Sequence, residues 1–214
     1  MVEMLGGTTS TIRTADQTAI ARFWSDLPGT FDPPGHWNQI TEIAAIMSKT
    51  NLENSARAFA LVDVALTDAG IEAWNVKYTN NTVRPVTVIR DGADGVNPLI
   101  TADSTWTPLW NTPAFPSYIS GHSTFSAAAA AVLTSIYGDH FAFTDPGDPT
   151  ENLTPRHFTS FEAAAQEAGM SRIYGGIHFM SDNIYGLQVG GEVGQYVVEH
   201  ELLSPKSGKC RQIQ

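Results

Sequence analysis

The sequence predicts an all-α fold, a helical bundle, and three observations support this prediction. Apolar residues recur every three or four positions through several long segments, as they do on the buried face of a helix. Strand signals are scarce, and the only short β-branched run is 86–89. Hydrophobic residues make up 42% of the 214 positions and charged residues 16%, a composition typical of a globular protein with a substantial core.

Three helices are predicted in the first half of the chain. The first covers 16–24 and the second covers 36–47, with a turn rich in Pro and Gly between them. The third, over 52–77, has the clearest helical spacing of apolar residues. The chain should leave the helical conformation near Arg84, because Pro85 disfavours helical geometry in the residue before it.

The second half begins with a predicted long loop over 86–119, and long ordered loops in compact domains are usually functional. A helix follows over 120–137, contains five consecutive alanines, and ends at a glycine. The stretch Thr-Ser-Phe-Glu at 159–162 fits a capping box that opens another helix, to about residue 168. The last helix is predicted over 177–203, loosened by four glycines.

These elements form one predicted domain over 13–205, since no repeat or linker divides the chain. Residues 1–12, rich in Gly, Ser and Thr, are expected to be a flexible lead-in, and 206–214 a tail. The single cysteine, Cys210, allows no intrachain disulfide and no cysteine metal site.

Charge and hydropathy narrow the classes of partner. The net charge of -10 argues against nucleic acid or an anionic membrane as the main partner. No apolar run approaches the ~20 residues needed to cross a bilayer. The residues after Met1 lack a basic segment followed by an apolar one, so no signal peptide is predicted in this chain.

Several ionisable residues are interpreted as ordinary surface features, because none has a partner at ligand spacing. The histidines in this group are predicted to lie in loops or at the surface: His36, His140, His157 and His200. An acidic segment is predicted to be a solvated loop rather than a calcium site: Asp145, Asp148 and Glu151.

The first segment that carries chemistry runs from Lys77 to Arg84. Seven residues is about two helical turns, so both cations should project from nearly the same face at the end of the third helix. Two cations on one face repel unless an anion lies between them. The alternative is a solvated basic helix end.

The second segment leads from Pro116 into Ser120-Gly121-His122 at a predicted helix start. Unpaired N–H groups and the helix dipole favour an anion there, and Gly121 lets the anion approach the backbone. His122 lies in the first turn, where it could exchange a proton beside the anion. The alternative is that Ser120 is merely a helix cap and His122 a surface histidine.

The third segment contains Arg172, His178 and Asp182. His178 and Asp182 are four residues apart, so on a helix the carboxylate could hold one imidazole nitrogen and leave the other aimed at a ligand. The planar guanidinium of Arg172 suits recognition of an oxyanion. The alternative is a local salt bridge between Arg172 and Asp182.

Together the three segments supply cations, a helix N-terminus and two histidines, with no carboxylate cluster for a divalent metal. This combination resembles the three-part signature of vanadium haloperoxidases and type-2 phosphatidic acid phosphatases, in order and in spacing. One departure is Ile119, which stands where the usual second motif has proline. The matching motifs are Lys77-x6-Arg84-Pro85, Pro116-Ser-x-x-Ser120-Gly121-His122 and Ser171-Arg172-x5-His178-x3-Asp182.

The resemblance implies a bound vanadate, or phosphate in the same place. His178 would bond to vanadium or attack phosphorus, His122 would be the acid–base residue, and Asp182 would orient His178. Asp26 could pair with Arg172 behind the site. The residues that would hold the oxyanion are Lys77, Arg84, Ser120, Gly121 and Arg172.

Three functions remain open on this resemblance. The first is a vanadate-dependent haloperoxidase that uses hydrogen peroxide and halide; Trp74 and Phe115 stand where chloride-oxidising members have aromatic residues at the halide site. The second is an acid phosphatase that hydrolyses small phosphomonoesters through a phosphohistidine. The third is a phosphate-binding domain without catalysis. Relatives often carry another helical half upstream and are often exported, so an exposed apolar face, a homodimer and an extracytoplasmic location are expectations by analogy.

Overall fold

Helix α6 (Gly121–Tyr137) lies at the centre of the molecule and packs against α4, α7 and α8. The computed structural model describes residues 1–27, 29–92 and 101–203. The other elements in this part of the chain are α1 (Val2–Gly6), α2 (Ala15–Phe23), α3 (Pro33–Met47), α4 (Leu52–Asn80), α5 (Pro85–Asp91), β1 (Phe143–Asp145), β2 (Arg156–Phe158), α7 (Phe161–Tyr174) and α8 (Met180–His200).

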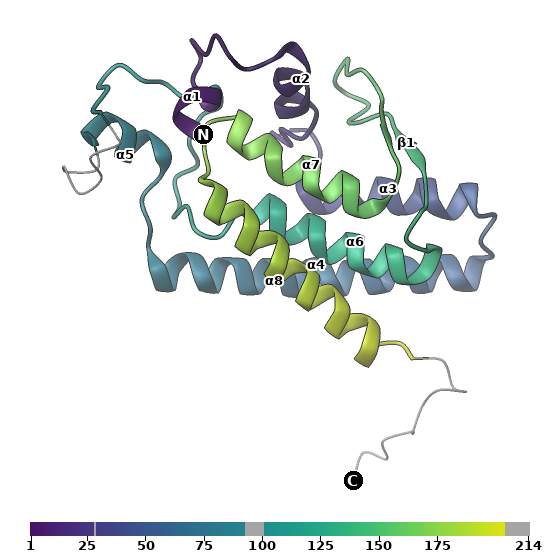
Figure 1. Ribbon diagram of the computed structural model, residues 1–214. Coiled ribbons are helices and arrows are strands. Elements are labelled where there is room, and N and C mark those ends of the chain that lie inside the picture. Colours follow the sequence, from purple (N-terminus) through teal and green to yellow (C-terminus); the bar gives the residue numbers. More distant parts are fainter. Residues whose placement is uncertain (28, 93–100, 204–214) are drawn as a thin grey trace.

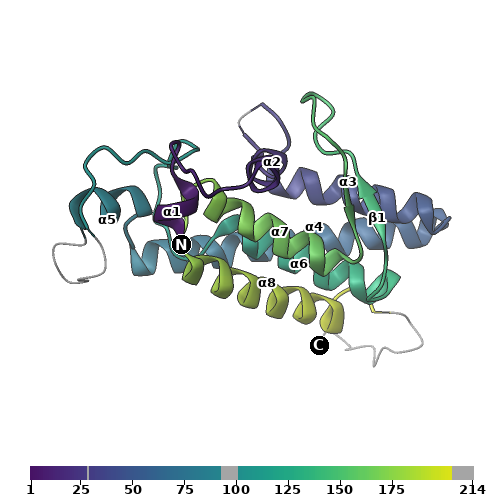
Figure 2. The same cartoon turned by 45° about the horizontal axis from the view of Figure 1, so that its top comes forward.

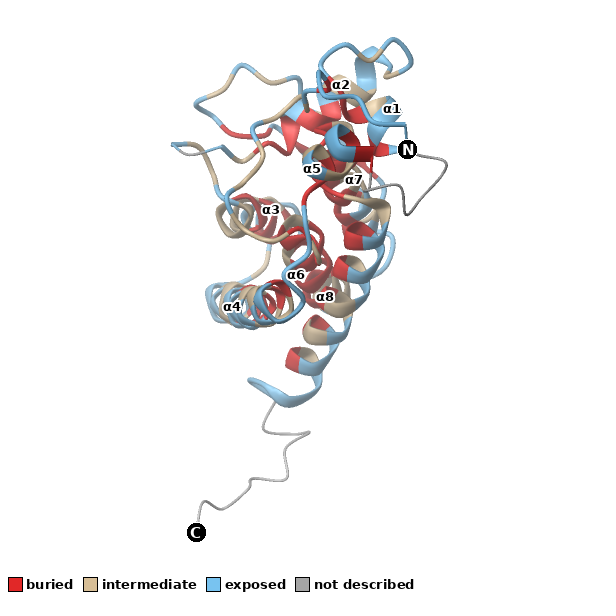
Figure 3. Ribbon diagram, turned by 90° about the vertical axis from the view of Figure 1, so that its left-hand side faces the viewer, coloured by how far each residue is buried: buried red, intermediate tan, exposed pale blue. Residues whose placement is uncertain are grey.

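The helices form layers, with α4 on one side of α6 and α7 on the other, and with α1 and α2 packed on α7 (Figures 1 and 2). Small residues dominate α6, and those from Ala127 to Ala130 are buried. Burial is concentrated on α6, on α7 and on the inward faces of α4 and α8, and the outer faces of α4 and α8 are exposed (Figure 3). The predicted all-α bundle is therefore confirmed. None of the helices in the described ranges is both long and apolar enough to span a membrane.

Three glycines let α8 approach α6 at backbone distance. A Cβ atom would lie 2.8 Å from the Ser120 carbonyl oxygen at Gly186, 2.1 Å from that of Thr124 at Gly190, and 2.4 Å from that of Ala128 at Gly194. The sequence predicted that glycines loosen this helix, whereas these three permit close packing. Gly191, in contrast, faces open space, with no atom within 4 Å of its Cβ position.

Neighbouring glycines of α8 provide a matched test of this packing. We expect Gly190→Ala to lower the free energy of unfolding by more than about 2 kcal/mol, because the new methyl group overlaps a backbone oxygen that cannot move independently. Gly191→Ala should instead raise it by up to about 1 kcal/mol, since alanine is the better helix former. Urea unfolding of both variants measures the difference, and equal stabilities would contradict the close α6–α8 contact.

Two helices lie where the sequence predicted irregular chain. Helix α1 begins within the expected flexible lead-in, with Val2 buried against the Ile89–Trp106 cluster. Helix α5 begins one residue before the expected loop 86–119, occupies the start of that loop and includes the β-branched run. Pro85 suits the first turn of a helix, and Gly92 ends α5 in the left-handed conformation. Burial of Ile89 in a tertiary cluster therefore outweighs the local strand preference.

The remaining differences concern β1, β2 and α7. The two strands form an antiparallel hairpin in which Phe143 lies opposite Phe158. Helix α7 is capped by Ser160, whose side chain accepts from the Ala163 N–H, and not by the predicted capping box. It continues to Tyr174, so it carries Arg172, beyond the predicted end near 168. Pro98, Cys210 and the predicted tail 206–214 lie outside the described residues.

Candidate active site

The C-terminal end of α4 and the N-terminal ends of α6 and α8 meet on the side of the molecule that carries α5 (Figure 1). All three segments with predicted chemistry converge there. Lys77 and Asp182 belong to the first and the last of these segments and are far apart in sequence. They are nevertheless close enough in space for the Asp182 carboxylate to raise the pKa of Lys77, against the lowering by burial and by Arg84. The bundle therefore gathers the three motifs into one site.

Lys77 and Arg84 meet by a different route from the predicted one. Helix α4 ends at Asn80, and Asn81 turns the chain in the left-handed conformation with φ of 48°. Arg84 is the N-cap residue of α5. The prediction that both cations project from one face of a single helix is therefore wrong, although the turn does bring them together.

Both cations are buried and held by carbonyl groups of the loop before α6. Lys77, which is 0% exposed, donates from Nζ to the Pro116 oxygen at 3.0 Å and to the Ser117 oxygen at 2.9 Å. Arg84 donates from Nε to the Phe115 oxygen at 2.9 Å. Burial, and then the neighbouring Arg84, lower the pKa of Lys77 to about 7. Burying this excess positive charge costs free energy, and a bound anion would offset that cost.

His178 lies between a carboxylate and a guanidinium. Its Nδ1 is 2.9 Å from Asp182 Oδ2, and its Nε2 is 3.0 Å from Arg84 Nη1. Because a guanidinium only donates and an ionised carboxylate only accepts, the proton lies on Nδ1 and the lone pair on Nε2. Burial, with Arg84 and Lys77 nearby, lowers the pKa of His178 to about 3. The imidazole is therefore neutral at pH 7, with Nε2 available as a ligand or nucleophile.

Asp182 reaches His178 from the first turn of α8, because that helix begins two residues after the histidine. Its Oδ2 also accepts from Ser117 Oγ at 2.6 Å and from the Phe179 N–H at 3.1 Å. Burial alone would raise the pKa of Asp182, but the hydrogen bonds from His178 and Ser117 lower it. The predicted pairing is thus present, as part of a helix cap and not on a continuous helix face.

The start of α6 supplies backbone donors. Ser120 is its buried N-cap residue, and the Ser120 N–H donates to the Asp182 carbonyl at 3.0 Å. Within the described chain, the N–H groups of Gly121 and His122 find no acceptor. A Cβ on Gly121 would lie 3.1 Å from the Trp74 ring, so the glycine also leaves room between the backbone and that ring. The free donors are therefore those of Gly121 and His122, and Ser120 contributes its hydroxyl.

Arg172 and His122 complete the site from α7 and α6. Arg172 is 3% exposed and donates from Nη1 to the Trp24 carbonyl. His122 Nε2 lies 3.2 Å from Asp26 Oδ2, within ion-pair distance, although the angles are not those of a hydrogen bond. Burial, and then Arg172, lower the pKa of His122 to about 4.

The predicted pair between Asp26 and Arg172 is not among the ion pairs of the described residues. Asp26 instead contacts His122 and His36, and its charge acts on Arg172 only at longer range. Burial alone would raise the pKa of Asp26, but both histidines hold it well below its usual range.

Residues that the sequence interpretation assigned to the surface are buried beside the site. His36 is 1% exposed and Asp145 is 0% exposed, and they contact each other at 3.0 Å. Asp148 is also buried, and its Oδ2 accepts from the Phe31 N–H. The prediction of surface roles for these three residues is wrong. Helical spacing could have placed His36 inside, since it precedes Ile40 and Ala44 at intervals of four on the apolar face of α3.

The predicted halide residues flank the lysine. The rings of Trp74 and Phe115 are 5.3 Å apart, and Lys77 Nζ lies 5.7 Å and 5.2 Å from their respective centroids. Phe115 also lies 5.0 Å from the Arg84 guanidinium carbon. The two aromatics thus form an apolar wall beside buried positive charge.

Unpartnered polar atoms indicate what the site can hold. Arg84 Nη2 and Arg172 Nε are buried without a hydrogen-bond partner among the described residues. Each nitrogen can donate, and buried donors are rarely left unpaired. Together with the free N–H groups at the start of α6, they match a tetrahedral oxyanion such as vanadate or phosphate. In the described part of the chain, no three His, Cys, Asp or Glu side chains converge as a metal site would require.

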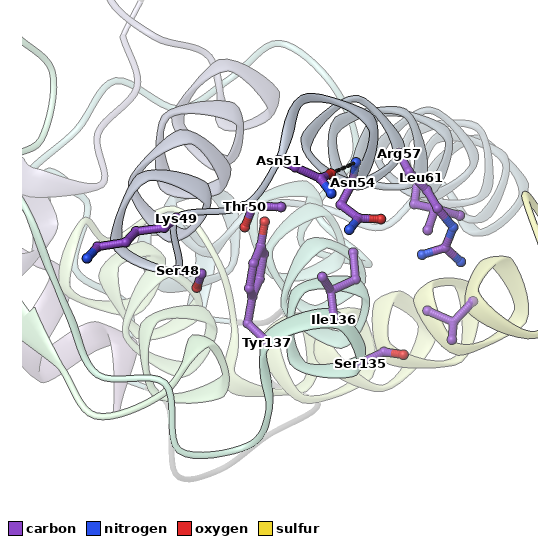
Figure 4. A pocket seen from close by; sticks show the side chains of 11 residues that line it. Ser48, Lys49, Thr50, Asn51, Asn54, Arg57, Leu61, Ser135, Ile136 and Tyr137 are labelled. Atoms are coloured by element: carbon purple, nitrogen blue, oxygen red, sulfur yellow. Dashed lines mark hydrogen bonds between the residues drawn. The ribbon is translucent and has the colours of Figure 1, made fainter. Parts of the chain in front are cut away.

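A cavity of about 840 Å³ lies elsewhere, between the α3–α4 turn and the C-terminal ends of α6 and α8 (Figure 4). Its lining includes Lys49, Asn51, Arg57 and Tyr137 and none of the predicted site residues. Arg57 is twenty residues before Lys77 on α4, which places the two about 30 Å apart. The residues of the candidate active site therefore lie away from this cavity.

Comparisons with known proteins identify the family of this chain. The family model described as the VCPO second helical-bundle domain matches residues 57–204, which include all three motifs. Vanadium chloroperoxidase from Curvularia inaequalis is 31% identical over an alignment that covers 81% of this chain and 37% of that protein.

Solved structures that are similar to this chain are also vanadium-dependent haloperoxidases. The crystal structure of the first bacterial vanadium-dependent iodoperoxidase matches with a TM-score of 0.79 and 39% identity, over 86% of this chain and 44% of that one. A holo-type bacterial vanadium-dependent chloroperoxidase matches with a TM-score of 0.66 over 92% of this chain and 46% of that one; at 19% identity it supports the fold alone. This chain thus spans less than half the length of these relatives. Because the family model matches more than half of the chain, this chain belongs to the family described as the VCPO second helical-bundle domain.

Proposed function

We propose that this chain carries the catalytic site of a vanadate-dependent haloperoxidase. The observation that supports this most strongly is the state of His178: a buried neutral imidazole whose Nε2 lone pair faces Arg84. A neutral nitrogen surrounded by cations can bond to the central atom of an oxyanion while the cations balance the charge on its oxygens.

The residues have separate tasks in this proposal. Lys77, Arg84 and Arg172 neutralise the anion, and the N–H groups of Gly121 and His122 donate to its oxygens. Bound vanadate supplies Lewis acidity that activates hydrogen peroxide toward halide. Asp182 keeps the proton of His178 on Nδ1 so that Nε2 stays unprotonated.

His122 is the residue proposed to move protons. Its Nε2 lies 3.2 Å from Asp26 Oδ2, and the charge of that carboxylate favours the neutral tautomer with the proton on Nε2 and the lone pair on Nδ1. At Nδ1 it could accept a proton beside the bound anion and return it later. The low pKa of His122 keeps it in this neutral, accepting form at pH 7.

A second function is supported by the same lone pair. His178 Nε2 can attack phosphorus of a phosphomonoester, forming an N–P bond as the P–O bond to the leaving alcohol breaks. An acid is then needed to protonate the alcohol, and water afterwards cleaves the N–P bond to release phosphate. His122 is the candidate acid, although its low pKa favours this role only in acidic solution.

A paired assay on metal-stripped protein separates the two functions. Bromination of a phenolic dye with hydrogen peroxide and hydrolysis of a chromogenic phosphate ester are each measured with and without orthovanadate. Bromination that depends on vanadate supports the haloperoxidase. Ester hydrolysis that vanadate inhibits, with no bromination, would instead support the phosphatase. Repeating the first assay with iodide and chloride identifies the halide.

Lys77 offers a test of the anion site without catalysis. We expect Lys77→Met, which keeps the buried volume, to weaken phosphate and vanadate binding about 10- to 100-fold through loss of a charge-assisted hydrogen bond. Lys49→Met, at the other end of the molecule, should leave binding unchanged. Calorimetry measures both, and equal dissociation constants for wild type and Lys77→Met would remove Lys77 from the site.

The same comparison predicts a pH dependence. A bound anion favours the ammonium form of Lys77, whose pKa in the free protein is about 7. The contribution of Lys77 to binding is therefore complete below pH 7 and falls as the pH rises above it. Because oxyanions also titrate, we expect the ratio of the two dissociation constants, variant over wild type, to shrink between pH 6 and pH 9. A constant ratio would contradict the shifted pKa.

A further inference from the structure

A chain of buried ionisable side chains extends from His122 away from the anion-binding residues. Asp26 Oδ2 lies 3.2 Å from His122 Nε2, and Asp26 Oδ1 lies 3.1 Å from His36 Nδ1. His36 Nε2 in turn lies 3.0 Å from Asp145 Oδ2. Four separate elements contribute one residue each: α6, the turn after α2, α3 and β1. This series of side chains is therefore brought together by the tertiary fold and not by a local sequence motif.

The contacts of His36 determine its charge. Both ring nitrogens face carboxylate oxygens, and a neutral imidazole could donate to only one of them. His36 is therefore an imidazolium. Burial would lower the pKa of His36, but the hydrogen bonds to Asp145 and Asp26 raise it to about 9.

The surroundings hold this imidazolium rigidly. The Trp24 ring stacks on His36 at 4.5 Å between centroids, and the Phe31 ring lies at 5.8 Å. Asp145 is fixed from behind, because its Oδ1 accepts from the Gly147 N–H at 2.9 Å. His36 thus has one position and one pair of partners.

Asp26 depends on these contacts. Its φ of 43° is in the left-handed region, which costs energy for a residue other than glycine and persists only where the surroundings impose it. Its carboxylate is 4% exposed, and its ion-pair partners among the described residues are His36 and His122. Three further charged groups interact with these histidines. Arg172 on α7 acts on His122, and Asp145 and Asp148, in β1 and the β1–β2 loop, interact with His36.

We propose that His36 is a positioning residue: held by Asp145, it fixes the Asp26 carboxylate against His122 and so keeps the proton of His122 on Nε2. The inference rests on the proposed function in one respect, namely that His122 exchanges protons through Nδ1. Without His36, two carboxylates would share a buried space with no cation between them. Asp26 would then move or take up a proton, and His122 would lose the acceptor that selects its tautomer.

Kinetics of His36→Gln test the proposal, with His157→Gln as the matched control. His157 is an exposed histidine on the hairpin that contacts Thr144. We expect kcat of His36→Gln to fall about 10- to 100-fold, as for other residues that orient active-site ligands, with the vanadate dissociation constant changed less than threefold. The control should match wild type in both. A folded His36→Gln protein with wild-type kcat would overturn the proposal.

Nuclear magnetic resonance of 15N-histidine-labelled protein gives a readout that needs no turnover. In the wild-type protein at pH 8 we expect His36 to carry protons on both ring nitrogens and His122 to carry its proton on Nε2. In His36→Gln the His122 signal should become a mixture of tautomers. A neutral His36 in the wild-type protein would overturn the proposal even if the variant does not fold. Because this measurement is independent of activity, it separates failure of the inference from failure of the proposed function.

Discussion

His178→Ala should abolish both vanadate-dependent bromination and phosphate ester hydrolysis, with a loss of at least about 10³-fold in kcat, as for removal of a residue that bonds to the reacting centre. Lys77 Nζ and the guanidinium groups are donors, and His122 is assigned to proton exchange, so His178 Nε2 is the nitrogen proposed to bond to the central atom. Oxyanion binding should persist, weakened, because those cations remain.

The control for this variant is His200→Ala, in which an exposed histidine near the end of α8 is replaced. Steady-state kinetics with saturating vanadate, together with thermal unfolding of each variant, separate lost chemistry from lost fold. A folded His178→Ala protein that retains either activity would remove His178 from its assigned role.

Asp182→Asn should have the second largest effect, about 10²- to 10⁴-fold in kcat, through the wrong imidazole tautomer. The carboxylate now accepts the Nδ1 proton of His178 at 2.9 Å. An amide nitrogen turned toward Nδ1 would donate to it and drive the proton to Nε2, the atom that must stay free. Ser117 bonds to the same oxygen, Oδ2, so in the variant its hydroxyl would have to accept from the amide nitrogen instead of donating.

Kinetics and the 15N shifts of His178 check this prediction together. The expected result is a large loss of kcat accompanied by a proton on Nε2. Activity within threefold of wild type, or unchanged tautomer with lost activity, would show that Asp182 does not act by holding the tautomer of His178.

The motif residues could be predicted from the sequence because each motif combines chemistry with local geometry. Ser120 caps a helix as its position predicted, and Asp182 pairs with His178 at the predicted spacing of four. The route by which Lys77 meets Arg84 could not be predicted, since it depends on the left-handed turn at Asn81. Asparagine is tolerant of that conformation, but the sequence alone does not say where it is used.

The buried chain behind His122 was missed for a physical reason. The partners of His36 are ten and 109 residues away, and neither separation has a helical or strand period. A buried charge is normally excluded from a core unless it is paired, and pairing across such distances is visible only once the chain is folded. The glycines of α8 were misread similarly, because their role depends on the backbone of α6.

The most direct test of the central claim is a crystal soaked in orthovanadate and measured for anomalous scattering from vanadium. We predict one strong peak at bonding distance from His178 Nε2, between Arg84 and the start of α6, and its loss in His178→Ala crystals. A peak only in the cavity lined by Lys49 and Arg57, or none at saturating vanadate, would contradict the assignment of this site.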